Sequence, residues 1–251
     1  MTTTEAKDFR ALLAGVTPRR EHGPPPAWFR QAAAVLYEGQ EPTRRDTWAR
    51  ELRTALSRSG GRVPLTVTHA WHARTVLPLL AETATRLGQD TAPYEALAAV
   101  HHDALTDRTP SASSWTAALE PALRRIYRAA FAYAEAYTTA HDNARAYALA
   151  NGFTPADADT YGRDYADQTT EPNARAFATA NTTANARATA TAYATSDPDA
   201  YARTFPGART RAYVRAAAAT LPENTPGGTS RHTSCDRIAD GLLDQLNRTR
   251  A

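Results

Sequence analysis

Apolar residues recur every three or four positions through most of this chain, the spacing that places them on one face of an α-helix. Residues 27–38 show the pattern and are followed by Gly39, a residue type that often terminates helices. A second helix is expected from Asp46 to the glycine pair at 60–61, and a shorter one over 94–105. The pattern therefore predicts an all-α protein.

Residues 62–70 carry two patterns at once. Alternate positions between Val63 and Val67 are apolar, as in a strand, whereas the apolar positions over 65–79 fit a helical stripe. Because the neighbouring segments read as helices, we predict a helix here, with a kink at Pro78.

Ser114 opens a helix that is predicted to run to about Ala150 and to be the longest in the chain. Its apolar stripe keeps helical spacing throughout, and Gly152 follows as a terminator. We expect this helix to be the centre of a helical bundle.

The stretch from Ala150 to Thr220 lacks Leu, Ile and Met, and Val214 is its one valine. Alanine favours helix but buries little apolar area, so this layer needs close packing or a partner for its stability. Hydroxyl residues stand just before prolines at Thr154, Thr170 and Ser196, which predicts three helices.

The patterns combine into a bundle with a long central helix, an appended Ala/Thr-rich layer and a C-terminal amphipathic helix. The expected organisation is a flexible tail at 1–25, a helical core at 26–152, an Ala/Thr/Arg-rich helical layer at 153–220, a linker at 221–234 and a C-terminal helix at 235–251. The last helix has Ile238, Leu242 and Leu246 on one face, which we expect to dock on the body of its own chain or of a second copy.

The composition limits which cellular location and which partners we expect. The chain has 251 residues, a formal net charge of +3 and a single lysine, Lys7, so arginine supplies nearly all the positive charge, as in proteins from high-GC bacterial genomes. One cysteine, Cys235, excludes an intrachain disulfide, and no apolar run approaches the ~20 residues that span a bilayer. We expect a cytoplasmic protein with no membrane partner.

Four histidines fall on predicted inward stripes and could form a metal site. Histidines from adjacent helices, helped by carboxylates, bind iron or zinc in helical bundles. The candidate ligands are His69, His72, His101, His141, Glu95, Asp103 and Glu135. The alternative is the commoner one: core histidines bonded to a backbone carbonyl or a tyrosine. The Glu-x-x-His pattern of di-iron bundles is absent from the sequence.

Two further segments suggest ligands. Asp157, Asp159 and Gly162 echo a calcium loop, but Gln168 stands where such a loop needs a bidentate glutamate, and an acidic first helical turn explains the residues more simply. Arginines alternate with aromatic residues in a second segment, the mixture that binds single-stranded nucleic acid. Its members are Arg203, Arg209, Arg211, Arg215, Tyr201, Phe205 and Tyr213.

The sequence carries no nucleophile elbow and no phosphate-binding glycine loop, and it leaves open whether the protein is an enzyme. An interaction or scaffolding protein, with a protein partner or self-association, is the first hypothesis, because the Ala-rich layer lacks large burying residues. A metal-binding protein or metal-dependent oxygenase is the second hypothesis, and a single-stranded nucleic-acid binder is the third.

Overall fold

The structure is a computed structural model that describes residues 3–15, 23–106, 108–131, 134–219 and 227–248. Every regular element in these ranges is helical, which confirms the predicted all-α class. The elements are α1 (Thr3–Ala14), α2 (Ala27–Gly39), α3 (Pro42–Arg58), α4 (Leu65–Trp71), a π-helical turn η1 (His72–Val76), α5 (Leu77–Arg86), α6 (Ala92–Asp103), α7 (Ala112–Phe131), α8 (Ala134–Ala150), α9 (Pro155–Ala194), α10 (Pro198–Ala202), α11 (Pro206–Ala217) and α12 (Gly227–Arg248).

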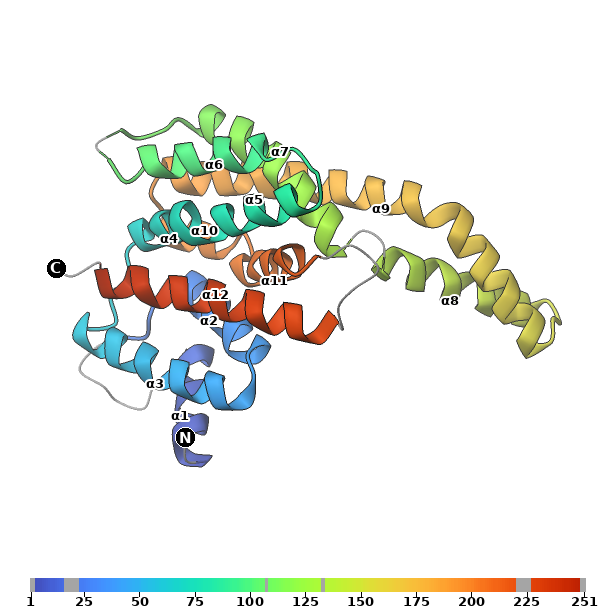
Figure 1. Ribbon diagram of the computed structural model, residues 1–251, viewed down its shortest axis with the longest axis horizontal. Helices are drawn as coiled ribbons and strands as arrows, with labels where there is room; N and C mark the ends of the chain where they lie inside the picture. The colour runs from blue at the N-terminus through green and yellow to red at the C-terminus, as the bar shows by residue number, and fades with distance from the viewer. Residues whose placement is uncertain (1–2, 16–22, 107, 132–133, 220–226, 249–251) are drawn as a thin grey trace.

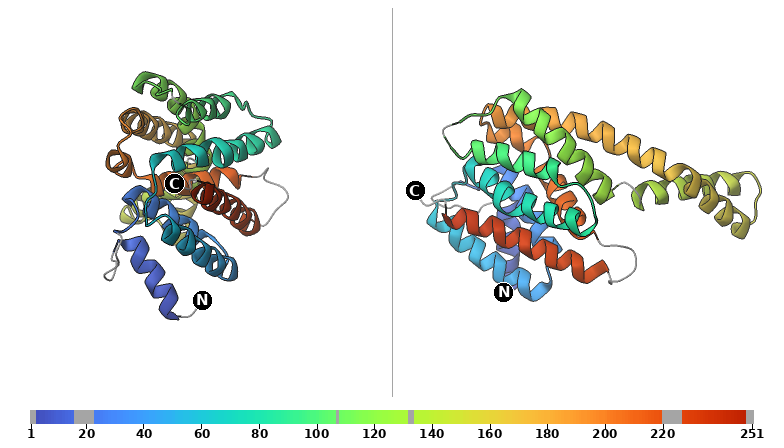
Figure 2. Two further views of the ribbon diagram at one scale, coloured as in Figure 1. Left: turned by 90° about the vertical axis from the view of Figure 1, so that its left-hand side faces the viewer. Right: turned by 45° about the horizontal axis from the view of Figure 1, so that its top comes forward.

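The molecule has two parts, which we call the arm and the body (Figure 1). The arm is residues 134–171, in which α8 and the first part of α9 lie antiparallel and project from the rest of the chain (Figures 1 and 2). The other helices form the body. There α9 continues along α7, and Thr183 Oγ1 donates a hydrogen bond to Glu120 Oε1 at 3.0 Å. One long helix therefore supports both parts.

The course of α9 corrects two predictions. α9 is one helix of 40 residues, where the cap signals predicted a division at Thr170. The Thr170 hydroxyl instead donates to the carbonyl of Ala166, one turn earlier, and Pro172 lies inside the helix. α9 is also longer than any other described helix, because the stretch predicted as the longest is divided between α7 and α8, with residues 132 and 133 outside the described part.

Four fully buried tryptophans mark the core of the body: Trp28, Trp48, Trp71 and Trp115. Two of them fasten α12 to the body, since Trp48 Nε1 donates to Ala239 O at 3.0 Å and Trp71 Nε1 donates to Ile238 O at 2.9 Å. Ile238, Leu242 and Leu246 are buried against the helices of the same chain, which confirms that this face docks. It docks on α2, α3, α4 and α11.

Both ends of the chain contain more helix than the sequence predicted. α1 lies within the expected flexible tail, and Phe9 is fully buried there, 5.0 Å from the Tyr37 ring and 6.4 Å from the Trp48 ring. α12 begins at Gly227, so residues 227–234 of the expected linker are helical. Leu12 and Leu13 pack against the core as well, so apolar side chains of α1 hold a segment that was expected to be flexible.

Residues 65–70 of the ambiguous stretch are helical, as predicted, because α4 begins at Leu65, whereas residues 62–64 precede the helix and are irregular. The expected irregularity near Pro78 takes the form of the π turn η1. Proline has no N–H to donate to the carbonyl four residues earlier, so a regular helix cannot run into it unchanged. The wide turn places His72 at its start, and π turns inside helices are often found at functional sites.

The arm is held together by small side chains. Where burial is described, its interior positions are Ala140, Ala144, Ala148, Ala158, Gly162, Ala166 and Thr170. A Cβ added at Gly162 would lie 2.9 Å from the carbonyl oxygen of His141, so the two helices approach too closely there for any larger residue. Close packing of this kind is what the alanine-rich sequence predicted.

Candidate functional site

Three of the predicted histidines meet in the body. His69 on α4 and His101 on α6 have their Nδ1 atoms 3.0 Å apart, and the ring of His72 stacks on His101 with centroids 4.8 Å apart. Trp115 and Tyr193 close the group, each within 5.5 Å of the His69 and His101 rings, centroid to centroid. Helical periodicity therefore predicted this convergence correctly for three side chains.

The bonds of His72 show which of the two interpretations fits it. Its Nδ1 lies 2.7 Å from the backbone oxygen of Thr68, and its Nε2 lies 3.1 Å from the hydroxyl of Tyr213. One ring nitrogen thus contacts a backbone carbonyl and the other a tyrosine hydroxyl, the two partners expected of a histidine that is part of the core. His72 is therefore a core histidine.

Burial keeps all three imidazoles neutral near pH 7. Desolvation lowers the pKa of His69 to about 4 and that of His72 to about 3. Desolvation lowers the pKa of His101 as well, and the neighbouring His72 and His69 act in the same direction. In the pair formed by His69 and His101, one Nδ1 must carry a hydrogen and donate it while the other accepts.

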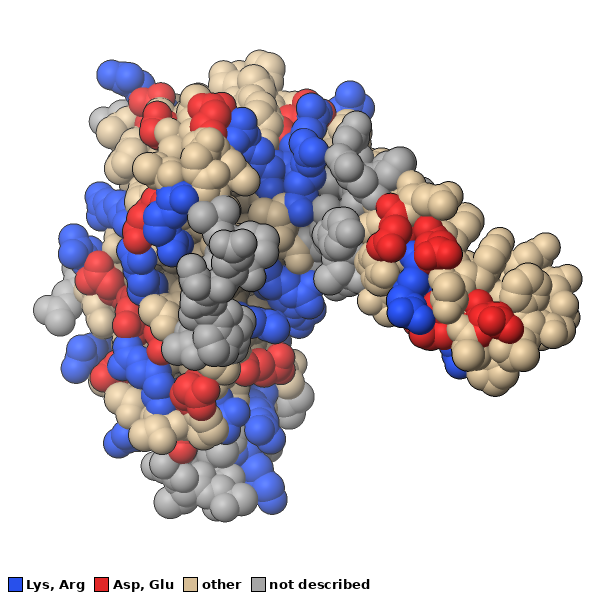
Figure 3. Space-filling model, turned by 45° about the vertical axis from the view of Figure 1, so that its right-hand side comes forward, with Lys and Arg blue, Asp and Glu red and all other residues tan. Residues whose placement is uncertain are grey.

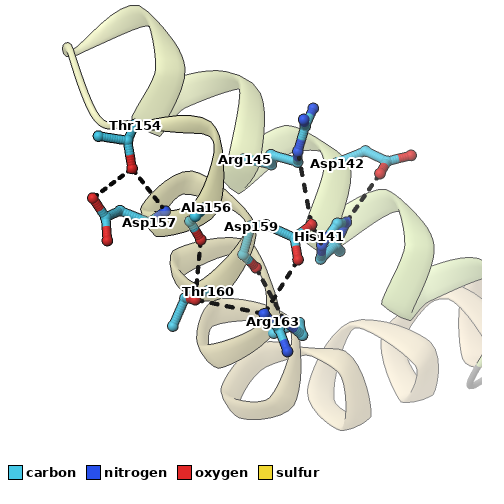
Figure 4. Close-up of polar contacts among 9 residues, drawn as sticks. All are labelled: His141, Asp142, Arg145, Thr154, Ala156, Asp157, Asp159, Thr160 and Arg163. Atoms are coloured by element: carbon cyan, nitrogen blue, oxygen red, sulfur yellow. Dashed lines mark hydrogen bonds and ion pairs between the residues drawn. The ribbon is translucent and has the colours of Figure 1, made fainter.

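The other predicted metal ligands lie elsewhere. His141 is in the arm, where its Nδ1 lies 3.0 Å from Asp142 Oδ1 and its Nε2 lies 3.3 Å from Asp159 Oδ1 (Figure 4). Glu95 accepts a hydrogen bond from Thr91, and Asp103 pairs with Arg108. The side chain of Glu135 is outside the described residues.

The structure therefore does not bring these seven candidate ligands together among the residues it describes. Within the described ranges, no three His, Cys, Asp or Glu side chains are grouped as a metal ion requires. Helical periodicity predicted that His69, His72 and His101 point inward. It could not predict that the chain enters the arm before His141.

The calcium-loop echo in the arm is accounted for by ordinary helix chemistry. Thr154 caps α9 by accepting from the backbone N–H of Asp157 at 3.2 Å, and its hydroxyl donates back to the carboxylate of that residue (Figure 4). Asp159 pairs with Arg163 at 3.2 Å, one turn along the helix. The carboxylates thus stabilise the start of α9 and join it to α8.

The arginine and aromatic segment is mostly interior. Arg209 is 2% exposed, its Nη2 donates to the Thr204 carbonyl at 2.9 Å, and its charged carbon lies 5.5 Å from the Tyr201 ring centroid. Tyr201 and Tyr213 are buried as well, and Arg215 is partly buried. Arg203, Arg211 and Phe205 are exposed. The two tyrosines that were expected to stack on bases are thus in the core, where nucleic acid does not reach them.

Large apolar side chains collect on the surface of the arm, a feature that the sequence analysis missed. The described chain has six exposed large apolar residues, of which Phe205 is the one on the body. The other five are Tyr147, Leu149, Phe153, Tyr161 and Tyr165. We call these five residues the tip. The Tyr161 ring lies 6.4 Å from that of Tyr147 and 5.9 Å from that of Phe153.

The arm also differs from the body in charge. Residues 134–171 contain seven acidic residues and two arginines, whereas the rest of the chain contains 19 acidic and 27 basic residues. Figure 3 shows acidic side chains on the arm beside broad uncharged areas, with basic side chains frequent on the body. The arm is thus an acidic projection with aromatic residues on its surface.

Comparisons with known proteins do not assign a function to the site. No family model, curated protein or solved structure matches the chain. In the described part of the chain, no helix is both long and apolar enough to cross a bilayer. Cys235 is fully buried, and burial raises the pKa of its thiol to about 12, so it is not poised as a nucleophile.

Proposed function

We propose that the protein is a helical interaction protein and that the arm is the part that binds its partner. The observation that carries the proposal is the position of the tip, which holds five of the six exposed large apolar residues in the described chain. Monomeric proteins seldom gather apolar side chains on one surface unless that surface is used for binding. Aromatic residues in particular supply much of the binding energy of protein interfaces.

The tip leaves apolar surface uncovered. Tyr147 is 62% exposed and Phe153 is 47% exposed, while alanines fill the seam between α8 and α9. Removing apolar area from water is favourable by about 25 cal/mol per Å². That free energy is available at the tip for association with another surface.

The charge of the arm indicates the chemistry of the partner. An excess of acidic residues around an apolar tip complements a protein surface that has an apolar groove with basic residues at its rim. Such charges increase the association rate, and salt screens them at distances beyond about 10 Å at 0.1 M. We therefore expect the association to weaken as salt is added.

The test compares two variants of the full chain in cells that naturally express it. The tip variant carries Tyr147→Ser, Phe153→Ser, Tyr161→Ser and Tyr165→Ser, and the control carries Phe205→Ser, which removes the one large apolar side chain exposed on the body at 70%. We expect proteins that co-purify with the wild type and the control to be lost from the tip variant. A partner retained by the tip variant would contradict the proposal, as would a wild type that recruits nothing.

Measuring the molar mass of the purified protein identifies self-association. If the wild type sediments as a multimer and the tip variant as a monomer, the partner is a second copy of the chain. Added salt should then shift the wild type towards the monomer.

A further inference from the structure

A pocket of about 370 Å³ opens beside the histidine cluster. Three segments distant in sequence surround it: residues 63–66 at the start of α4, Ala104 and residues 108–110 after α6, and the turn between α9 and α10. Its volume lies within the range of about 300–1,000 Å³ that is usual for small-molecule sites. An apolar cavity of about 150 Å³ binds benzene, so this pocket has room for a two-ring compound.

The wall of the pocket is largely apolar, with Val63, Leu65 and Pro110 among its members. His69 and Tyr193 also reach it, and both belong to the buried aromatic cluster. Ring faces and aliphatic groups of this kind favour a flat apolar ligand.

His69 has one polar ring atom outside its contact with His101. Its Nδ1 is occupied by His101, which leaves Nε2 as the remaining polar atom of a neutral ring. When His101 donates, the hydrogen of His69 is on Nε2, and when His69 donates, Nε2 is an acceptor. The pair can therefore match either a donor or an acceptor on a ligand by shifting its hydrogens.

Among the described residues, Arg108 is the one charged side chain that lines the pocket. It is 80% exposed and its Nη1 lies 3.3 Å from Asp103 Oδ1, an exposed ion pair of the kind that contributes little to stability. Its guanidinium is therefore able to exchange that partner for the carboxylate of a ligand. Ser196, also in the lining, has a φ of 51°, the left-handed conformation that commonly ends a helix, here α9.

We propose that this pocket binds a small carboxylic acid with a flat two-ring body, its rings against His69 and Tyr193 and its carboxylate at Arg108. The site is separate from the arm and does not depend on the proposed interaction function.

The experiment is calorimetric titration of the full chain with 2-naphthoate. Two related compounds separate the contributions of the rings and the charge: 2-naphthalenemethanol has the rings without the carboxylate, and acetate has the carboxylate without the rings. We expect saturable binding of one 2-naphthoate per chain, affinity lower by roughly tenfold for the alcohol, and no measurable binding of acetate.

Two variants test whether the ligand binds in this pocket and contacts Arg108. Ala104→Phe fills the pocket from its wall and should abolish binding of both ring compounds. Arg108→Gln should lower the affinity for 2-naphthoate to that of the alcohol and leave the alcohol unchanged. The matched control is Arg58→Gln, an exposed arginine at a different pocket, which should bind as the wild type does. The tip variant should also bind normally, which excludes the arm as the site.

A wild type without saturable binding would overturn the proposal, as would binding that survives Ala104→Phe. Loss of affinity for acid and alcohol alike in Arg108→Gln would contradict the assigned role of the charge. Should Ala104→Phe fail to fold, nitrogen-15 spectra of the wild-type histidines decide: the His69 ring signals should move on saturation, while those of His232, which lies outside the pocket, should not.

Discussion

The body and the arm are built from the same kind of helix but bury different side chains. The body encloses four tryptophans and many aliphatic residues, whereas the described interior of the arm contains nothing larger than Thr170. The arm instead carries its large side chains, such as Tyr147 and Phe153, on the outside. Large buried residues supply the area that stabilises a core, whereas small residues let two helices approach closely. The body therefore has the packing of a stable core, whereas the arm leaves its large side chains exposed.

The largest expected effect is the loss of the last helix. Removing residues 235–251 exposes the apolar surface of the body that Ile238, Leu242 and Leu246 cover. It also leaves two tryptophan N–H groups without their acceptors. At ~1.5–3 kcal/mol for each aliphatic side chain, stability to urea should fall by at least about 4 kcal/mol.

Replacing the arm sharpens this comparison. Exchanging residues 134–171 for a short Gly/Ser linker should change the stability of the body by less than about 1 kcal/mol, because the arm adds nothing to its core cluster. Our assignment of the two parts would be reversed if the body kept its stability without α12, or if removing the arm lowered that stability by several kcal/mol.

Acid should weaken the body through its buried histidines. Their pKa values are about 6.5 when unfolded, and lower, about 4 for His69 and about 3 for His72, when folded. Below pH 6.5 the unfolded chain therefore binds more protons, so stability is full above that pH and falls as pH decreases. The limit is about 1.4 kcal/mol per pH unit for each histidine.

Urea unfolding between pH 7 and pH 5 measures this loss. His69→Gln combined with His101→Gln should flatten the dependence, and the control His102→Gln, at an exposed position, should keep it. A slope that is unchanged when His69 and His101 are both replaced would show that other groups cause the acid sensitivity.

A local effect is expected at the closest approach within the arm. Gly162→Leu places side-chain atoms where even a Cβ would be 2.9 Å from the His141 carbonyl oxygen, so α8 and α9 must separate. Overpacking of this kind costs about 1–3 kcal/mol. Hydrogen exchange should become faster in residues 140–166 and stay unchanged in the body. Faster exchange around Trp48 and Trp71 would mean that the two parts are coupled.

The smallest effect is expected from the tip. The serine substitutions there should change stability by about 0.5 kcal/mol or less in each case, because exposed positions contribute little to folding. Thermal unfolding compares the tip variant with Phe205→Ser on the body. A tip variant that melts well below that control would show that these aromatic residues support the fold rather than a binding surface.

Features set by local spacing could be predicted from the sequence. The stripes that place His69, His72 and His101 inward need only helical periodicity, and so does the buried face of α12. The cap signal at Thr154 was also read correctly, since its hydroxyl accepts the backbone N–H of Asp157. A helix does begin at Pro198 as predicted, but its cap is Asp197 and not the hydroxyl residue Ser196.

Features set by packing could not be predicted in this way. Thr170 and Pro172 carry the same signal as a true cap, yet the helix continues, because α9 packs on α8 before them and on α7 after them. The position of His141 depends on where the chain leaves the body, and the exposure of the tip depends on alanines filling the seam. Neither fact is contained in a short window of sequence.

The claim that the arm is the binding surface is tested most directly by photo-crosslinking from single positions in living cells. A photoreactive phenylalanine at Phe153, which is 47% exposed, samples the tip, and the same residue at Phe205, which is 70% exposed, samples a more accessible place on the body. The account predicts a discrete adduct from position 153, reduced when the other tip residues are serine, and none from position 205. Adducts of equal yield from both positions, or from 205 alone, would contradict it.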